Sequence, residues 1–229
     1  MTTNKNSEKS TMHQVPVDNS VKPTLYDFVK RLIDITFSIV ALVFLLPLLI
    51  MLVLLIKIES PGPVFYRQRR IGKFGRPFDF YKFRTMYLWA DSTKFVKSLN
   101  ESVGRSQDKK TDLFRIRDDT RVTGVGRWLR RTSLDELPQL FGLFRGDMSL
   151  VGPRPLLPYE WEVISGEFER RATVKPGLTG PWQVGTYWEA GLEEMMKMDL
   201  DYIERRSLLF DLLVLLKTIP VVIFGRGAR

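Results

Sequence analysis

The sequence predicts a mainly α-helical membrane protein with one small β-hairpin. Residues 35–56 form an uncharged apolar run long enough to cross a bilayer as a helix. Residues 60–86 contain two short aromatic-rich segments separated by Gly-Lys-Phe-Gly, a pattern typical of a hairpin. A second apolar segment, 208–224, carries only Asp211 and Lys217 as charges. A chain of 229 residues can bury a core around these elements.

The first apolar run has Pro47 at its middle, where proline removes a helical hydrogen bond and clashes with the preceding turn. Basic residues flank the run on both sides, which favours a cytoplasmic position for both ends. A central proline is also tolerated in true spans. The residues alone therefore leave two alternatives open: a single span, or a re-entrant helix that bends at Pro47 and returns.

The remaining segments are interpreted from the positions of their glycines and prolines and from the spacing of their apolar residues. We expect a disordered polar tail over 1–20, a membrane-inserted helix over 21–59 and a compact domain over 60–229. The Gly-, Arg- and Pro-rich stretch after residue 120 predicts short helices joined by turns. The other expected elements are a helix near 88–100 followed by a loop, a helix over 156–172, a loop over 175–185, a helix over 189–206, and a helix over 208–224 that packs on the core or lies in the membrane interface.

Composition excludes several kinds of chemistry. The chain has no cysteine, and its one histidine, His13, lies in the polar tail. Thiolate zinc sites, cysteine nucleophiles and Ser-His-Asp catalysis are therefore excluded, and chemistry must rest on carboxylates, amines, guanidinium groups or hydroxyls. The formal net charge of +9 indicates acidic partners, namely nucleic acid, anionic lipid or phosphorylated substrates.

The segment "RRTSLDELPQL" places two carboxylates, Asp135 and Glu136, side by side. Ser133 and Glu136 fit a capping box, which would make the pair an ordinary helix start. With Ser133 as the N-cap, however, Pro138 would fall beyond the first turn, where proline is unfavourable. We therefore expect the helix to begin after Leu134, with both carboxylates at its start, where the helix dipole favours them.

Arginines crowd the same segment, and their planar forks match phosphate oxygens. Two carboxylates among arginines indicate Mg²⁺-assisted phosphoryl chemistry, with one carboxylate as nucleophile and the other as metal ligand. The alternative is that the arginines only balance Asp135, Glu136 and Asp147 in structural ion pairs. The arginines are Arg127, Arg130, Arg131, Arg145 and Arg154.

From about Lys30 to about Phe224 the chain resembles the bacterial sugar transferases, the monotopic polyprenyl-phosphate phosphoglycosyl transferases that initiate exopolysaccharide or O-antigen chains. The blocks that carry the resemblance are "KRLIDITFSIVALVFLLPLLI", "SPGPVFYRQRRIGKFGRPFDFYKFRTM", "LRRTSLDELPQL", "GDMSLVGPRPLLP", "VKPGLTGPWQV" and "SLLFDLLVLLKT".

The resemblance implies transfer of a sugar-1-phosphate from a UDP-sugar to undecaprenyl phosphate, through a covalent aspartyl-phosphosugar, with release of UMP. It implies Mg²⁺ as cofactor and membrane lipid as surroundings. It also implies a re-entrant helix kinked near Pro47, and a cytoplasmic catalytic domain with interfacial helices on the bacterial inner membrane. A homo-oligomer is possible within the family, and nucleic acid is not an expected partner.

The same resemblance assigns roles to individual residues. Asp135 is the expected nucleophile, Glu136 the Mg²⁺ ligand, and Lys82 a further active-site base or charge. Arg130 and Arg154 are expected phosphate contacts, and Asp199 and Asp211 are expected to support them.

One departure concerns the donor. After "WQV" many relatives continue with Gly-Arg-Asn, whereas this chain reads "GTYWEAG", so no sugar is assigned. The alternative to an enzyme is a non-catalytic, basic, membrane-anchored scaffold that holds anionic lipid.

Overall fold

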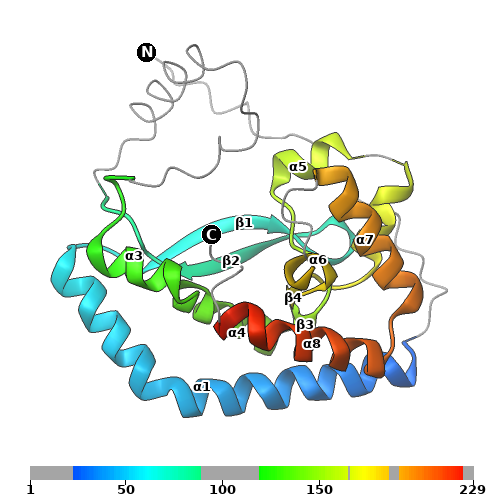
Figure 1. Cartoon of the computed structure of the whole chain (residues 1–229), viewed down its shortest axis with the longest axis horizontal. Coiled ribbons are helices and arrows are strands. Elements are labelled where there is room, and N and C mark those ends of the chain that lie inside the picture. The colour runs from blue at the N-terminus through cyan, green and yellow to red at the C-terminus, as the bar shows by residue number, and fades with distance from the viewer. Residues whose placement is uncertain (1–22, 89–118, 165, 186–190, 224–229) are drawn as a thin grey trace, which may run out of the picture.

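The computed structural model describes the chain except for residues 1–22, 89–118, 165, 186–190 and 224–229, so the expected tail and the expected helix near 88–100 lie outside the described residues. One long helix, α1 (Leu25–Glu59), runs along the base of the molecule, and a small mixed domain lies above it (Figure 1). The other helices are α3 (Gly124–Arg131), α4 (Leu140–Arg145), α5 (Pro158–Val163), α6 (Pro181–Val184), α7 (Leu192–Arg205) and α8 (Leu208–Ile223).

Helix α1 contains the predicted apolar run and is the one described helix that is long and apolar enough to cross a membrane. Thr24 caps its start in a reciprocal capping box with Asp27. Only 11% of its most apolar window is buried, which distinguishes it from the core helix of a soluble protein. Figure 1 shows the helix bending part-way along, and Pro47 lies inside it, in keeping with the predicted kink.

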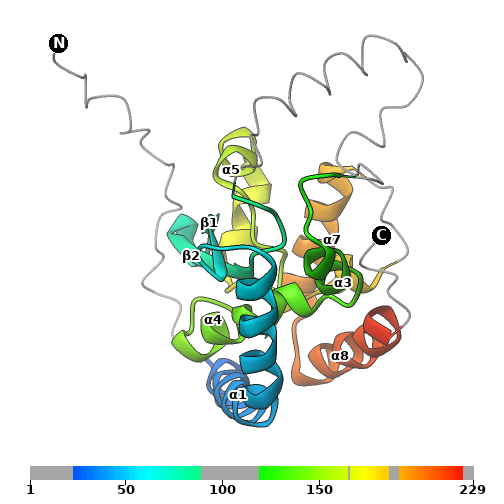
Figure 2. The same cartoon turned by 90° about the vertical axis from the view of Figure 1, so that its left-hand side faces the viewer.

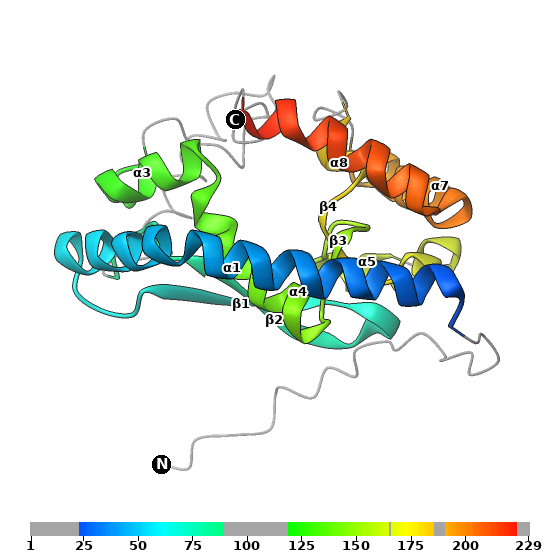
Figure 3. The same cartoon turned by 90° about the horizontal axis from the view of Figure 1, so that it is seen from below.

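Helices α1 and α8 lie along the same side of the molecule (Figures 1 and 2), and from below α1 extends along the molecule with α8 beside it (Figure 3). Both helices expose large apolar side chains that the domain does not cover. A contiguous apolar surface of this kind marks a membrane or protein contact. On α8 the exposed residues are Leu208, Leu209, Leu212, Leu213, Leu216, Ile219 and Val222.

The predicted hairpin is confirmed. Strands β1 (Phe65–Ile71) and β2 (Pro77–Phe83) pair antiparallel, and the short 3-10 turn η1 (Lys73–Gly75) joins them. Phe74 and Gly75 both have positive φ in this turn, at 61° and 71°. The inner face of the hairpin contributes Phe78 and Phe80 to the main apolar core.

A second, parallel sheet joins β3 (Ser149–Val151) to β4 (Gly177–Thr179). The expected loop over 175–185 is therefore wrong, since this stretch forms β4 and α6. The reason is a close backbone approach: a β-carbon on Gly177 would overlap the backbone of Gly152. Because glycine has a low strand propensity, the local sequence gives no signal for β4. The strand forms because the absence of a side chain at Gly177 lets its backbone approach that of Gly152.

The prediction of one helix over 156–172 is also wrong. Helix α5 ends at Val163, because the next residue, Ile164, has an extended backbone (φ −88°, ψ 146°). A 3-10 segment, η3 (Gly166–Thr173), follows. Trp161, Ile164 and Ala172 are buried on both sides of the break. The expected short helices after residue 120 and the two C-terminal helices are confirmed.

The N-terminal third of α1 is fastened to the domain by polar contacts. Asp34 is buried, and its Oδ1 accepts hydrogen bonds from the Leu150 backbone N–H (2.8 Å) and the Ser149 hydroxyl (3.1 Å). Asp211 of α8 accepts from the Lys30 ammonium at 2.5 Å and from the hydroxyl of Tyr202 at 2.8 Å. These contacts fix α1 against β3 and α8.

Helix α3 packs unusually close to the end of β2. The Thr123 hydroxyl accepts from the Gly126 N–H at 2.8 Å, and the Thr123 N–H donates to the Thr85 carbonyl at 3.0 Å. A β-carbon on Gly126 would overlap that same carbonyl.

We expect Gly126→Ala to lower the free energy of unfolding by about 1–3 kcal/mol, because the backbone of α3 must move away from β2. Thermal or denaturant unfolding of the detergent-solubilised protein measures the change. Gly191→Ala is the matched control, since no atom of the described residues beyond its chain neighbours lies within 4 Å of the added β-carbon. An equal effect of the two substitutions would contradict the close packing.

Candidate active site

Three elements bring charged side chains together above α1. Strand β2 supplies Lys82, helix α3 supplies Arg130, and the 3-10 segment η2 (Leu134–Gln139) supplies Asp135 and Glu136. Segments 50 residues apart in sequence therefore meet at one place. The Lys82 ammonium lies 2.6 Å from Glu136 Oε1 and 4.0 Å from Asp135 Oδ2.

A strained turn positions the two carboxylates. Ser133 connects α3 to η2 with left-handed backbone angles (φ 56°, ψ 16°), which a non-glycine residue adopts at a cost of about 1 kcal/mol or more. Its side chain makes no capping hydrogen bond, so the capping-box interpretation of Ser133 is wrong. The expected start after Leu134 is wrong by one residue: η2 begins at Leu134 with Ser133 in the N-cap position, and Pro138 lies inside it because the segment is a short 3-10 helix and not an α-helix. Asp135 and Glu136 do lie in its first turn, as expected.

The two carboxylates differ in exposure and therefore in chemistry. The Asp135 side chain is 13% exposed, whereas that of Glu136 is 42% exposed. Burial raises the pKa of Asp135 to about 6; the charges of Lys82 and Arg130 oppose the rise, and that of Glu136 adds to it. A carboxylate with a pKa near 6 is ionised at neutral pH, is more basic than an ordinary aspartate and is poorly solvated, as a nucleophile should be.

A buried threonine orients Arg130. The Thr85 hydroxyl accepts from Arg130 Nε at 2.9 Å, and the Thr85 carbonyl holds the start of α3. Thr85 therefore sets the position of α3 and the direction of the guanidinium together. Sequence reasoning missed this residue, although it stands three positions after Lys82 in the block "YKFRTM".

A second missed residue is Arg70, which is buried on the hairpin beside the site. Its guanidinium lies 5.3 Å from the Phe80 ring centre and donates to the Pro155 carbonyl at 2.9 Å. The Lys82 ammonium lies 5.7 Å from the same ring. Arg70 is one of three basic residues in "RQRR", and nothing in that run indicates which of them turns inward.

Two adjacent carboxylates fit a magnesium ion that also binds substrate phosphates. Mg²⁺ in phosphoryl-transfer sites takes one or two protein carboxylates and completes its octahedron with phosphate oxygens and water. Glu136 is exposed enough to supply such an oxygen. Among the described residues no group of three or more acidic or histidine side chains forms a closed metal cage, so phosphate oxygens would have to complete the site.

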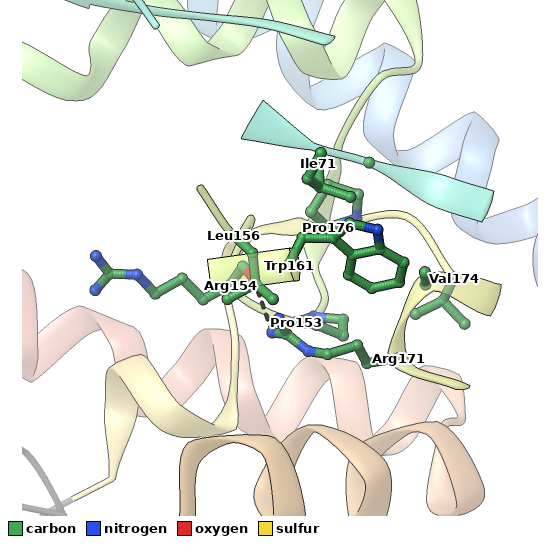
Figure 4. Close-up of a pocket in the computed structure, with 10 residues that line it drawn as sticks. Ile71, Pro153, Arg154, Leu156, Trp161, Arg171, Val174 and Pro176 are labelled. Carbon is green, nitrogen blue, oxygen red and sulfur yellow. Dashed lines mark hydrogen bonds between the residues drawn. The ribbon is translucent and has the colours of Figure 1, made fainter. Parts of the chain in front are cut away.

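Arg154 follows β3, and its side chain is exposed. Its guanidinium extends away from a small neighbouring pocket, while its carbonyl accepts a hydrogen bond from Arg171 (Figure 4). The pocket has space of about 20 Å³, enough for one water molecule rather than a nucleotide. Among the described residues no hydrogen bond or ion pair joins Arg154 to Asp135 or Glu136.

Asp199 and Asp211 both lie in buried ion pairs. Asp199 is fully buried and pairs with Arg171, and burial raises the pKa of Asp199 to about 6. Asp211 pairs with Lys30 and links α8 to α1. Neither touches Asp135 in the described part of the chain, so their expected supporting role could act only through the packing of helices.

The chain was compared with known protein families and with individual proteins. The family described as bacterial sugar transferase matches residues 25–225, nearly the whole described chain. The chain belongs to the bacterial sugar transferase family. Every element of the site, from Lys82 to Asp211, lies within this match.

Individual relatives of this sugar transferase differ in length. It is 39% identical over 199 residues to the "Exopolysaccharide production protein ExoY" of Sinorhizobium fredii, with 87% of each chain covered. It is 40% identical over 202 residues to the "UDP-glucose:undecaprenyl-phosphate glucose-1-phosphate transferase" of Caulobacter vibrioides, covering 85% of this chain and 69% of the relative.

A third relative is the "Undecaprenyl-phosphate galactose phosphotransferase" of Salmonella typhimurium. The identity is 37% over 214 residues, which are 93% of this chain. This sugar transferase spans only 44% of that relative's length.

The buried charge of Asp135 predicts that the native site is destabilising. Its folded pKa of about 6 exceeds the ordinary value of 3.8, so the folded state binds the proton more tightly and loses stability as pH rises through this range. We expect Asp135→Asn to increase the free energy of unfolding by about 1–2 kcal/mol at pH 7.5, and the gain to vanish below about pH 4.

Unfolding measured across this pH range tests the expectation. Asp201→Asn is the control, because Asp201 is exposed and its one ion-pair partner among the described residues is Arg205 on its own helix. A loss of stability in Asp135→Asn at pH 7.5 would show instead that Asp135 is a structural partner of Lys82 and Arg130.

Proposed function

We propose that this sugar transferase moves a sugar-1-phosphate from a UDP-sugar to undecaprenyl phosphate and releases UMP, as an initiating step of exopolysaccharide or related surface-glycan synthesis. The observation that supports it best is Asp135, a buried carboxylate held near two cations and beside a second carboxylate. The printed names of the relatives support the two substrates. The sugars in those names include galactose, glucose and N-acetylgalactosamine.

In the first proposed step, a carboxylate oxygen of Asp135 attacks the phosphorus that carries the sugar. A new oxygen–phosphorus bond forms, the bond to the UMP oxygen breaks, and UMP leaves with the electron pair. The low solvation of Asp135 favours attack, and its pKa of about 6 keeps it ionised at neutral pH. The product is an aspartyl phosphosugar.

In the second proposed step, an oxygen of the polyprenyl phosphate attacks the same phosphorus and frees Asp135. The cations of Lys82 and Arg130 offset the charge that gathers on the phosphoryl oxygens. The Thr85 hydroxyl accepts from Arg130 Nε and so restricts the orientation of the guanidinium. Magnesium held by Glu136 would supply further neutralisation of phosphate charge.

The proposed placement in the membrane rests on the exposed apolar side chains of α1 and α8. We propose that α1 enters one leaflet, bends at Pro47 and returns, so that the apolar sides of α1 and α8 rest in the cytoplasmic leaflet. The acceptor's phosphate lies at the membrane surface, and a site directly above α1 is within reach of it. The basic charge on both flanks of the apolar run supports a cytoplasmic position for both ends.

We expect the purified full chain, given undecaprenyl phosphate, Mg²⁺ and a panel of UDP-sugars, to release UMP with at least one donor. Asp135→Asn should lower that rate by at least about 10³-fold, because no nucleophile remains. Wild-type protein incubated with the donor alone should gain the mass of one sugar phosphate, and Asp135→Asn should not.

Asp147→Asn is the matched control, since Asp147 lies in the same sequence segment and, within the described part of the chain, its side chain pairs with Arg145 alone. Its activity should stay within a few-fold of wild type. Full activity in Asp135→Asn would overturn the nucleophile. A chain inactive with every donor that still binds anionic vesicles would favour the scaffold alternative.

The topology has its own test. Cysteines introduced singly at Lys22 and Lys73 flank the N-terminal part of α1 and the hairpin turn, and the chain has no native cysteine. In intact cells we expect a membrane-impermeant thiol reagent to leave both unlabelled, and permeabilised cells to show labelling of both. Labelling at Lys22 alone in intact cells would establish a full span.

A further inference from the structure

Two cationic groups converge on one glycine at the end of α4. The Arg31 Nη2 and the Lys175 Nζ lie 3.1 and 3.2 Å from the point where a β-carbon on Gly146 would stand. Gly146 has φ +90°, which suits glycine and closes the helix. The arrangement brings like charges from α1 and from the segment before β4 close together.

Of these two cations, Arg31 forms hydrogen bonds with described residues and Lys175 does not. The guanidinium of Arg31 donates to the carbonyls of Leu143 and Phe144, at 2.6 and 2.7 Å, and so caps the C-terminus of α4. Lys175 makes no hydrogen bond or ion pair with any described residue. It is nevertheless half-buried, and burial together with the nearby Arg31 lowers the pKa of Lys175.

The carboxylates nearest to Lys175 are engaged elsewhere. Asp34 accepts from Leu150 and Ser149, as described above, and Asp147 Oδ2 accepts from the Arg145 guanidinium at 2.6 and 2.9 Å. A third cation, Lys73 of the hairpin turn, adds to the positive potential at Lys175. A half-buried ammonium among cations is costly unless an anion joins it.

The location indicates which anion. Arg31 lies one helical turn before Ile35, where the uncharged apolar run of α1 begins. Next to it, Phe141 and Phe144 of α4 expose nearly half of their side chains. Aromatic residues beside a cation at the end of a membrane segment are typical of the headgroup level of a bilayer. The phosphate groups of membrane lipids lie at this depth.

We propose that Arg31, Lys175 and the Cα of Gly146 form a binding site for the phosphate of an anionic membrane lipid, separate from the carboxylate pair. Lys175 supplies the free charge, Arg31 supplies a fixed guanidinium, and the lack of a side chain at Gly146 lets both cationic groups approach its backbone. The inference rests on the membrane placement in the proposed function and not on its chemistry.

The test uses the full chain in a neutral maltoside detergent, titrated with phosphatidylglycerol and followed by native mass spectrometry. We expect Lys175→Gln to weaken the tightest lipid-binding event by about tenfold, the effect of about 1.4 kcal/mol. Lys175→Arg, which keeps the charge, should bind within a few-fold of wild type. Lys197→Gln, an equal loss of charge on the distant helix α7, should bind as wild type.

Two further probes separate the source of the anion. Zwitterionic phosphatidylcholine and free inorganic phosphate should both bind at least tenfold more weakly than phosphatidylglycerol. Equal binding by wild type and Lys175→Gln would overturn the site, and equal competition by inorganic phosphate would overturn its assignment to a lipid. UMP release is measured in the same samples. If wild type shows no preference for phosphatidylglycerol but releases UMP normally, the lipid site alone is contradicted. If wild type shows the preference but releases no UMP, the proposed function alone is contradicted.

Discussion

The side chain of Asp135 is only 13% exposed, so water solvates its carboxylate poorly, and the other charged groups of the site are arranged around it. Lys82 reaches it from the hairpin, and Arg130 approaches from α3. Each cation is itself held: Lys82 by Glu136, and Arg130 by the hydroxyl of Thr85. The close packing of Gly126 on Thr85 keeps α3 and β2 in fixed relation, so that both cations stay in place.

The long helix α1 also anchors the domain through polar contacts, which its apolar composition does not indicate. Its apolar run faces outward, while its first third carries the polar residues that fix the domain to it. Asp34 accepts bonds from β3, and Lys30 reaches Asp211 of α8. Buried polar contacts of this kind are directional, so they determine the angle between the membrane helix and the domain more strictly than apolar packing alone. The height of the site above the apolar surface depends on them.

The sequence predicts the features that arise from local patterns. The apolar run, the hairpin and the pair Asp135–Glu136 at a helix start could all be inferred from spacing and punctuation. The parallel sheet could not, because β4 forms where Gly177 allows two backbones to touch, and glycine weakens every local strand signal. Thr85 and Arg70 were missed for a related reason: their importance lies in contacts with α3 and with Pro155, which are distant in sequence.

The basic groups at the carboxylate pair and those near Gly146 differ in how far neighbouring carboxylates neutralise them. At the carboxylate pair, cations and carboxylates already neutralise one another, and a phosphate that enters must disturb existing pairs, as a reacting substrate does. Near Gly146, by contrast, the neighbouring carboxylates accept hydrogen bonds from other groups, and Lys175 has no hydrogen-bond or ion-pair partner among the described residues. A site of that kind suits a resident anion that stabilises the fold at the bilayer surface.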